Sequence, residues 1–367
     1  MNDLGQAQAI QPRGDFGYVQ AAHRRAEEMR TSEAVPLEPP TLGELQEALG
    51  EPVQRCELWV SNWRNRIYRV ELASGVTLVA KQVVVGTDAM VLCQYDQLHA
   101  LASLKIPKLR LPKAMALLGA KRLFVMELAQ GRTIQALTWK SYSRQDLVEA
   151  CELAGKILAR MHSTWTEKIC SMPVEALARD LAATPWHLST QEQRILQASL
   201  ARLATAEVTM GQVYYDYKPA NLLYHNGQLT LIDPPEMLWQ GVHLWDFSLF
   251  RSFMRRELWK FGLRHPFGRR RAIIRQAIAA FERGYLSGFA KPHPDPILFA
   301  LATRFFELQR VAQLITMQTA KVAMARLKMP LVRDGRLGNP VSNRLSLPLL
   351  EWEKSWLFRQ LDRAIIV

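Results

Sequence analysis

The sequence has 367 residues, of which 49% are hydrophobic and 22% are charged, proportions that are typical of a globular protein and exclude a chain that is disordered as a whole. Lysine and arginine exceed aspartate and glutamate by 47 − 34 = +13, which favours an anionic partner. No stretch reaches the roughly 18 consecutive apolar residues that a membrane helix needs, and the N-terminus lacks the basic-then-apolar order of a signal peptide. We therefore expect a cytoplasmic protein.

The four cysteines indicate neither a disulfide framework nor a metal site. Cys56, Cys93, Cys151 and Cys170 are far apart and show no paired metal-type spacing. We expect no disulfide framework, and two of the cysteines lie in apolar patterns, where a reduced thiol acts as a small hydrophobic side chain.

Residues 1–53 are predicted to form an N-terminal extension. Residues 1–40 are polar and show no sustained hydrophobic period, so they suggest a flexible or wrapping segment. Thr41 with Glu44 three residues later has the spacing of a capping box, which predicts a short helix to Leu49.

Residues 54–130 are predicted to form a small β-rich unit. Apolar strand-like runs at 57–60, 67–72, 76–85 and 123–128 indicate an antiparallel meander, and residues 88–104 have helical periodicity. Lys81 lies deep in the third run, where its ammonium group needs a partner. An acid in the 88–104 helix would suit, but the available Asp88 and Asp96 are not obviously placed for it.

Residues 131–367 are predicted to be mainly helical. Ser143 and Asp146 begin an amphipathic helix that ends near His162, a residue we expect to be structural. Asn226-Gly227 between two apolar runs predicts a hairpin.

The stretch from Gln212 to Asp233 carries the clearest chemistry. Asp216 is followed by Lys218, Asn221 and Asp233. Phosphoryl transfer needs a carboxylate that orients and deprotonates the acceptor hydroxyl, together with oxygen ligands for Mg²⁺ on the phosphates. Asp216 is the candidate base, Asn221 and Asp233 are the candidate metal ligands, and Lys218 is a candidate cation for the transferring phosphoryl group. The hairpin should bring Asn221 and Asp233 close together.

A basic run lies between Arg251 and Arg275, where nine basic residues accompany one acid, Glu257. This run could meet an anionic substrate, nucleotide phosphates, a membrane surface or nucleic acid, or it could simply be a solvated helix face. Of these partners we expect an anionic small molecule or peripheral membrane contact rather than nucleic acid.

Six ordered motifs together resemble the protein-kinase-like superfamily, and the pattern is most similar to aminoglycoside and choline kinases. They cover about residues 54–260, and the first resembles a nucleotide loop that leads into a strand. In chain order they are Trp63-Arg64-Asn65-Arg66-Ile67-Tyr68-Arg69-Val70, Val79-Ala80-Lys81, Leu158-Ala159-Arg160-Met161-His162-Ser163, Asp216-Tyr217-Lys218-Pro219-Ala220-Asn221, Leu231-Ile232-Asp233 and Trp245-Asp246-Phe247-Ser248. In that family the last motif braces the catalytic loop.

The resemblance implies an α+β, bilobal protein-kinase-like fold with an N-lobe at 54–130 and a helical C-lobe at 131–367. It also implies ATP and Mg²⁺ as cofactors, with Lys81 on the α- and β-phosphates and adenine against the backbone near Glu127 and Leu128. The loop at residues 61–65 has no glycine, so side chains such as Ser61 and Arg64 would have to assist the phosphates.

The sequence departs from protein kinases at three further points. Tyr214 stands where histidine is usual, Asp233 precedes Pro234-Pro235, and the helix at 88–104 has no clearly placed acid. The base and metal ligands are all present, so we expect an active ATP-dependent kinase that phosphorylates a hydroxyl of a small molecule, such as a sugar, a sugar-lipid or an amino alcohol. The alternatives are a serine/threonine protein kinase and a non-catalytic pseudokinase that binds an anionic partner.

Overall fold

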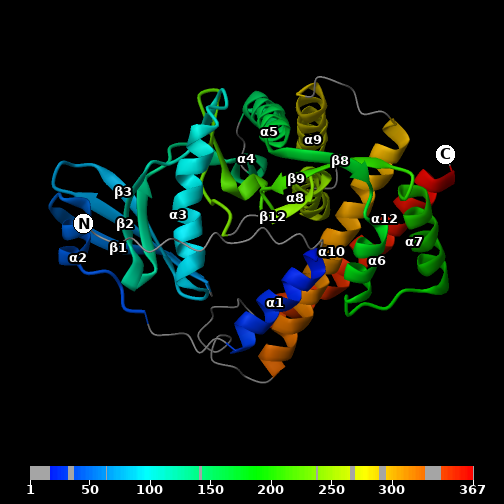
Figure 1. The fold of residues 1–367 in the computed structure, drawn as a ribbon, viewed down its shortest axis with the longest axis horizontal. Coiled ribbons are helices and arrows are strands. Elements are labelled where there is room, and N and C mark those ends of the chain that lie inside the picture. Colours follow the sequence, from blue (N-terminus) through cyan, green and yellow to red (C-terminus); the bar gives the residue numbers. More distant parts are fainter. Residues whose placement is uncertain are drawn as a thin grey trace.

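The computed structural model of the chain describes residues 17–31, 37–62, 64–139, 143–236, 239–264, 269–288, 295–326 and 340–366. A β-rich lobe formed by the earlier part of the chain lies beside a larger helical lobe (Figure 1). This arrangement confirms the expected α+β bilobal fold. The lobe boundaries at residues 54 and 130 stay predictions, although β1 begins at Val53 and β6 ends at Glu127.

The N-lobe is a five-stranded antiparallel sheet in the order β1-β2-β3-β6-β5. A short 3₁₀ turn, Gly119–Lys121, connects β5 to β6. Helix α2 (Leu42–Leu49) covers one face and α3 (Asp88–Ser103) the other. The capping box of Thr41 and Glu44 begins α2 as predicted. The strands are β1 (Val53–Ser61), β2 (Asn65–Leu72), β3 (Thr77–Val83), β5 (Ala114–Leu118) and β6 (Leu123–Glu127).

The alternation of side chains along β3 explains why a lysine can lie in an apolar strand. Leu78 and Ala80 pack in the cluster under α2, whereas Val79 and Val83 pack in the cluster under α3. Because successive strand residues point to opposite faces, Lys81 shares the α3 face. Its ammonium group can therefore reach the space between the lobes.

A second sheet lies where the lobes meet, in the order β4-β11-β10-β7. Strands β10 and β11 form the predicted hairpin, and the two turn residues Asn226 and Gly227 have φ angles of 46° and 74°. Positive φ at both positions is what a tight type I′ turn requires. The strands are β4 (Leu109–Arg110), β7 (Arg132–Thr133), β10 (Leu222–His225) and β11 (Gln228–Leu231).

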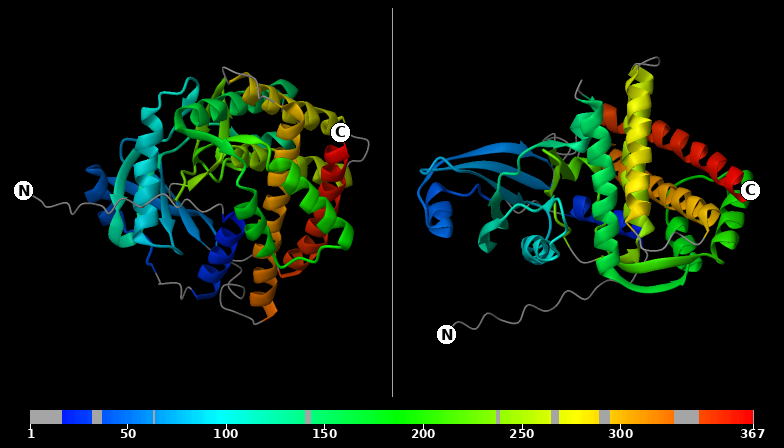
Figure 2. Two further views of the ribbon diagram at one scale, coloured as in Figure 1. Left: turned by 45° about the vertical axis from the view of Figure 1, so that its right-hand side comes forward. Right: turned by 90° about the horizontal axis from the view of Figure 1, so that it is seen from above.

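The C-lobe surrounds a long apolar core and a three-stranded sheet in the order β12-β9-β8. Helices α5 and α9 lie side by side (Figures 1 and 2). A β-carbon at Gly155 would lie 2.2 Å from the carbonyl oxygen of Phe281, so glycine is required for this close approach. The elements are α4 (Ile134–Trp139), α5 (Arg144–Trp165), β8 (Thr166–Ser171), α6 (Val174–Ala182), α7 (Thr190–Leu203), β9 (Glu207–Val213), 3₁₀ turn η2 (Pro219–Asn221), β12 (Trp239–Val242), α8 (Leu244–Arg264), α9 (Arg270–Ser287), α10 (Pro296–Arg326) and α12 (Pro340–Ile366).

One helix was not predicted. Residues Tyr18–Thr31 form α1, which lies against α10 in the C-lobe (Figure 1). The ring of Tyr18 stacks on that of Trp245, with centroids 3.9 Å apart and planes 8° apart, and Asp180 accepts the backbone N–H of Val19 at 2.9 Å. The sequence predicts a flexible or wrapping segment here and no helix, because tertiary packing, which the hydrophobic period does not reveal, stabilises the helix.

Within the described ranges, the helices lack any apolar stretch long enough to span a bilayer. The four cysteines are free thiols, as expected.

Candidate active site

The loop that follows β9 is held in an unusual backbone conformation. Tyr215 has φ of 69°, a left-handed value that is unfavourable for a residue with a side chain. The carboxylate of Asp246, at the start of α8, accepts the backbone N–H groups of Tyr214 at 2.6 Å and Tyr215 at 2.7 Å. These bonds and the stacking of the Tyr215 ring on Trp239, at 4.0 Å, stabilise the turn that presents Asp216.

A buried histidine, His162, contacts the carboxylate of Asp246. His162 Nε2 lies 3.2 Å from Asp246 Oδ2, and His162 Nδ1 lies 2.9 Å from the hydroxyl of Tyr285. Burial lowers the pKa of His162 to about 3, so the imidazole is neutral near pH 7. Burial raises the pKa of Asp246 to about 7, against the two backbone N–H groups, which lower it. His162 is therefore structural, and the Asp246 motif braces the loop as the resemblance implied.

Asp216, Lys218 and Asn221 form one hydrogen-bonded group. Lys218 Nζ lies 2.5 Å from Asp216 Oδ2, and Asn221 Nδ2 donates to the backbone oxygen of Asp216 at 3.1 Å and to its Oδ2 at 3.2 Å. The amide nitrogen of Asn221 is thus directed toward Asp216. These bonds leave the side-chain oxygen of Asn221 for another partner.

Asp233 lies next to this group because β10 and β11 are paired. Ile232 N donates to Asn221 O at 3.1 Å, and the hydroxyl of Tyr214 donates to the backbone oxygen of Asp233. Burial opposes ionisation of Asp233, but Lys81 and Lys218 outweigh it and hold the pKa of this carboxyl below its usual value. Asp233 is therefore ionised at neutral pH.

Lys81 finds its partner in the other lobe. Its Nζ lies 2.6 Å from Asp233 Oδ1, and its side chain is 5% exposed. The acid sought in the 88–104 helix is not the partner, since Asp88 instead pairs with Arg122 at 2.7 Å. Helix α3 contacts the site through Gln94, which donates to Pro234 O at 3.1 Å.

The turn between β1 and β2 is closed by an asparagine instead of a glycine. Asn62 Oδ1 accepts the backbone N–H groups of Arg64 at 2.9 Å and Asn65 at 2.8 Å. The side chain of Arg64 turns inward, where its Nη2 lies 2.5 Å from Glu236 Oε2. Ser61 ends β1 with an exposed side chain, and Trp63 lies outside the described residues.

The predicted adenine contact lies at the junction of the lobes. Glu127 ends β6, and its backbone N–H already donates to Lys113 O at 3.0 Å. Its carboxylate accepts the N–H of Lys113 at 3.1 Å. Leu128 follows without regular structure and is 37% exposed. The N–H of Glu127 is therefore not available to adenine, and a hydrogen bond to adenine at this junction would need a different backbone group.

The donor set suits Mg²⁺ held jointly with phosphates. Among the described residues no three His, Cys, Asp or Glu side chains converge on one point. Asn221 and Asp233 nevertheless offer an amide oxygen and a carboxylate, and Mg²⁺ commonly takes few protein ligands beside waters and phosphate oxygens.

Three residues near the site were missed by the sequence analysis: Glu236, Gln94 and Arg25 of α1. They line a small cavity of about 30 Å³ that Asp216 and Asp233 also line. Glu236 had one weak signal, its position three residues after Asp233, whereas Arg25 had none.

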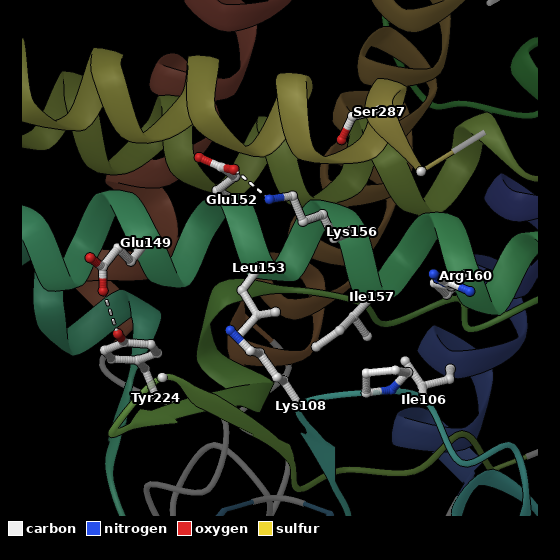
Figure 3. Close-up of a pocket in the computed structure, with 13 residues that line it drawn as sticks. Ile106, Lys108, Glu149, Glu152, Leu153, Lys156, Ile157, Arg160, Tyr224 and Ser287 are labelled. Carbon is white, nitrogen blue, oxygen red and sulfur yellow. Dashed lines mark hydrogen bonds and ion pairs between the residues drawn. The ribbon is translucent and has the colours of Figure 1, made fainter. Parts of the chain in front are cut away.

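A larger cavity, of about 590 Å³, lies elsewhere, between α5 and the segment that precedes β4 (Figure 3). Glu149 accepts the Tyr224 hydroxyl at 2.9 Å, and Glu152 pairs with Lys156 at 2.6 Å. These groups satisfy one another, and none of the predicted catalytic or metal residues lines this cavity.

A family model described as the phosphotransferase enzyme family matches residues 56–290. A search of curated proteins finds no match.

Solved structures show the same fold at low identity. Amicoumacin kinase hAmiN, in complex with AMP-PNP, Ca²⁺ and Ami, is 14% identical with a TM-score of 0.55, over 92% of this chain and 96% of that one. A thermostable mutant of aminoglycoside phosphotransferase APH(4)-Ia, in ternary complex with AMP-PNP and hygromycin B, is 14% identical with a TM-score of 0.52, over 89% and 97%. A choline/ethanolamine kinase family protein from Mesorhizobium loti is 12% identical with a TM-score of 0.52, over 94% and 97%. By its family match and its kinase-like fold, this chain belongs to the phosphotransferase enzyme family.

Proposed function

We propose that this phosphotransferase is an ATP- and Mg²⁺-dependent kinase that transfers the γ-phosphoryl group to a hydroxyl of a small molecule. The observation that carries the proposal is the meeting of Lys81, from the N-lobe, with Asp233 beside Asp216 and Asn221, at 2.6 Å. A base, two oxygen ligands and two lysines are the parts that phosphoryl transfer requires.

Asp216 is the proposed base. It takes the proton of the acceptor hydroxyl as the oxygen–phosphorus bond forms and the bond from the γ-phosphorus to the bridging oxygen breaks, with ADP as leaving group. Lys218, 2.5 Å from Asp216, lies where it can stabilise the charge on the transferring group. Asp246 holds this loop through its backbone bonds.

Asn221 and Asp233 are the residues that would hold Mg²⁺, which when bound neutralises charge on the phosphates. Lys81 is proposed to exchange its partner, from the Asp233 carboxylate to phosphate oxygens, when nucleotide enters. Arg64 lies close enough to Asp233 to lower the pKa of its carboxyl, and it adds positive charge near that group. Adenine is proposed to lie against the backbone after β6, near Glu127 and Leu128.

A small acceptor is favoured by the short connection after Asp233. Strand β12 begins at Trp239 and α8 at Leu244, so no long segment is left between the metal ligand and the C-lobe to dock a peptide. Structures of the same fold hold the small molecules named above, which supports this choice. Use of ATP fits the cytoplasmic location expected from the sequence.

The proposal is tested with Asp216→Asn in ATP turnover assays across sugars, amino alcohols and aminoglycosides. Loss of a general base commonly lowers kcat by ~10²–10⁴. The KM for ATP should change little because Asp216 is assigned to the acceptor. Glu149→Gln, a matched charge removal at an exposed site, should leave kcat unchanged.

A thermal shift with AMP-PNP and Mg²⁺ shows whether the variant still folds and binds nucleotide. Unchanged turnover in Asp216→Asn would contradict the assigned base. Phosphate incorporation into the protein or a peptide, with none into small hydroxyl compounds, would favour a protein kinase.

A further inference from the structure

Three arginines of the basic run at residues 251–275, Arg251, Arg255 and Arg256, pair with carboxylates inside the C-lobe. Arg255 binds the carboxylate of Glu307, with Nη1 to Oε2 at 2.7 Å, and Arg251 Nε lies 2.7 Å from Glu282 Oε1. Lys260 pairs with Glu257 at 2.8 Å. Arg251 and Arg255 are therefore neither part of a solvated face nor free to bind an anion, because both are paired with carboxylates.

Two arginines on different helices lie near Tyr215, the residue before the proposed base. The guanidinium carbon of Arg25, on α1, lies 5.5 Å from the centroid of the Tyr215 ring. Gln313 Nε2 donates to the Tyr215 hydroxyl at 2.6 Å, and Gln313 Oε1 accepts from Nη1 of Arg310. Helices α1 and α10 thus bring Arg25 and Arg310 to the same residue.

Arg25 also faces the reacting groups, since it lines the small cavity that Asp216 and Asp233 share. Its Nη2 lies 3.8 Å from Glu236 Oε2, the same atom that lies 2.5 Å from Arg64. One carboxylate therefore lies beside two guanidinium groups. Around Glu236 the two guanidinium groups therefore outnumber the carboxylate by one charge.

Two guanidinium N–H groups next to this region lack partners. Nε of Arg310 and Nη2 of Arg256 are buried without a hydrogen bond, and within the described residues Arg310 forms no ion pair. Arg256 uses its Nε on Glu353, at 2.8 Å. Burial, and then the charge of Arg256, lower the pKa of Arg310 to about 10, so the Arg310 side chain remains a cation at neutral pH. Buried cations with unsatisfied donors are unfavourable unless an anion binds them.

Two of these residues come from parts of the chain outside the family match, which covers residues 56–290. Arg25 precedes it and Arg310 follows it. Arg25 on α1 and Arg310 on α10 thus both lie outside the matched region.

We propose that the acceptor carries an anionic group, a carboxylate or a phosphate, which Arg25, Arg256 and Arg310 bind while its hydroxyl faces Asp216. Guanidinium groups suit such anions because their N–H groups match two oxygens at once. The inference rests on the proposed function, whose acceptor it narrows to one charge class.

The first test measures anion binding with the nucleotide site filled. The full chain is saturated with AMP-PNP and Mg²⁺, and its Tm is followed during titration with inorganic phosphate or sulfate at constant ionic strength in chloride. A saturable rise in Tm is expected, and it should be lost in Arg310→Gln and Arg25→Gln, each compared with its own Tm without added anion. Arg310→Lys keeps the charge and should weaken the rise without abolishing it.

Arg24→Gln is the matched control, because Arg24 is the exposed neighbour of Arg25 on α1 and loses the same charge. Its anion-dependent shift and basal ATP turnover should equal those of the wild type. No saturable shift in the wild type, or an equal shift in Arg24→Gln, Arg25→Gln and Arg310→Gln, overturns the inference.

The second test compares acceptors in matched sets: hexoses, the corresponding uronic acids and the hexose 6-phosphates. The KM for charged members should rise about 10- to 100-fold in Arg310→Gln, as expected for loss of a charge-assisted hydrogen-bonded contact, with a smaller change in kcat. Phosphorylation of neutral members as fast as charged ones overturns this inference alone. Failure of the chain to bind AMP-PNP with Mg²⁺ overturns the proposed function instead.

Discussion

The ammonium group of Lys81 and the carboxylate of Asp233 lie 2.6 Å apart, although 152 residues separate them in the chain. This ion pair joins a strand of the N-lobe to the hairpin of the C-lobe. The proposed metal ligand, Asp233, and the proposed phosphate-binding lysine, Lys81, therefore neutralise each other as long as neither Mg²⁺ nor nucleotide is bound.

The metal role of Asp233 predicts a specific loss in Asp233→Asn. An amide is a weaker Mg²⁺ ligand than a carboxylate, so the Mg²⁺-dependent part of the AMP-PNP thermal shift should largely disappear. The measurement is Tm with AMP-PNP in Mg²⁺ and in EDTA. Asp96→Asn, at an exposed position on α3, serves as control. An equal Mg²⁺ dependence in Asp233→Asn and wild type would refute the assignment.

Arg64 and Glu236 are predicted to be energetically coupled. Their side chains are 10% and 17% exposed, and the contact at 2.5 Å joins the β1–β2 turn to the segment after Asp233. A double-mutant cycle with Arg64→Gln and Glu236→Gln should give a coupling free energy of about 0.5–3 kcal/mol in denaturant unfolding. Strictly additive losses would show that the contact between Arg64 and Glu236 does not contribute to stability.

Glu307 predicts a pH-dependent stability. Burial opposes its ionisation, but Arg255, Arg251 and Arg304 outweigh burial and lower its pKa to about 2, from 4.5. Because the folded state favours the ionised form, the stabilisation is fully present above pH 4.5 and is lost as the pH falls toward 2. Glu307→Gln should therefore lower the free energy of unfolding by about 3–5 kcal/mol at pH 7, because it leaves buried arginines unpaired.

The measurement for Glu307 is urea unfolding of wild type and variant at pH 7 and pH 3. The difference between the two proteins should shrink at pH 3. Glu351→Gln, which removes a carboxylate that is 45% exposed, should have little effect at either pH. A loss in Glu307→Gln that is the same at both values would contradict the ion-pair account.

Tyr18 predicts a link between α1 and the catalytic loop. Tyr18→Ala removes the ring that stacks on Trp245 and should lower the free energy of unfolding by about 3–5 kcal/mol, the range for large buried aromatic side chains. It should also lower kcat, because Trp245 Nε1 donates to Tyr215 O at 3.3 Å and so shares the support of the loop. Tyr18→Phe keeps the ring and should retain most stability and activity. Equal losses in the two variants would show that stacking is not the cause.

Local signals in the sequence determined much of the fold and of the site. Thr41 and Glu44 specified a helix start, Asn226-Gly227 specified a hairpin, and the spacing of Asp216, Asn221 and Asp233 around that hairpin specified their meeting. Each of these features depends on residues close in the chain, so turn and capping chemistry suffices to predict them.

Tertiary structure alone decided the partners of the charged groups. Lys81 pairs with Asp233 instead of an acid on α3, and Arg64 pairs with Glu236. Arg25 and Arg310, which are far apart in the sequence, both lie near Tyr215. Helix α1 is likewise stabilised by a tertiary contact, the stacking of Tyr18 on Trp245. Such contacts join segments whose separation in sequence carries no signal, because packing of the whole core sets which long side chains meet.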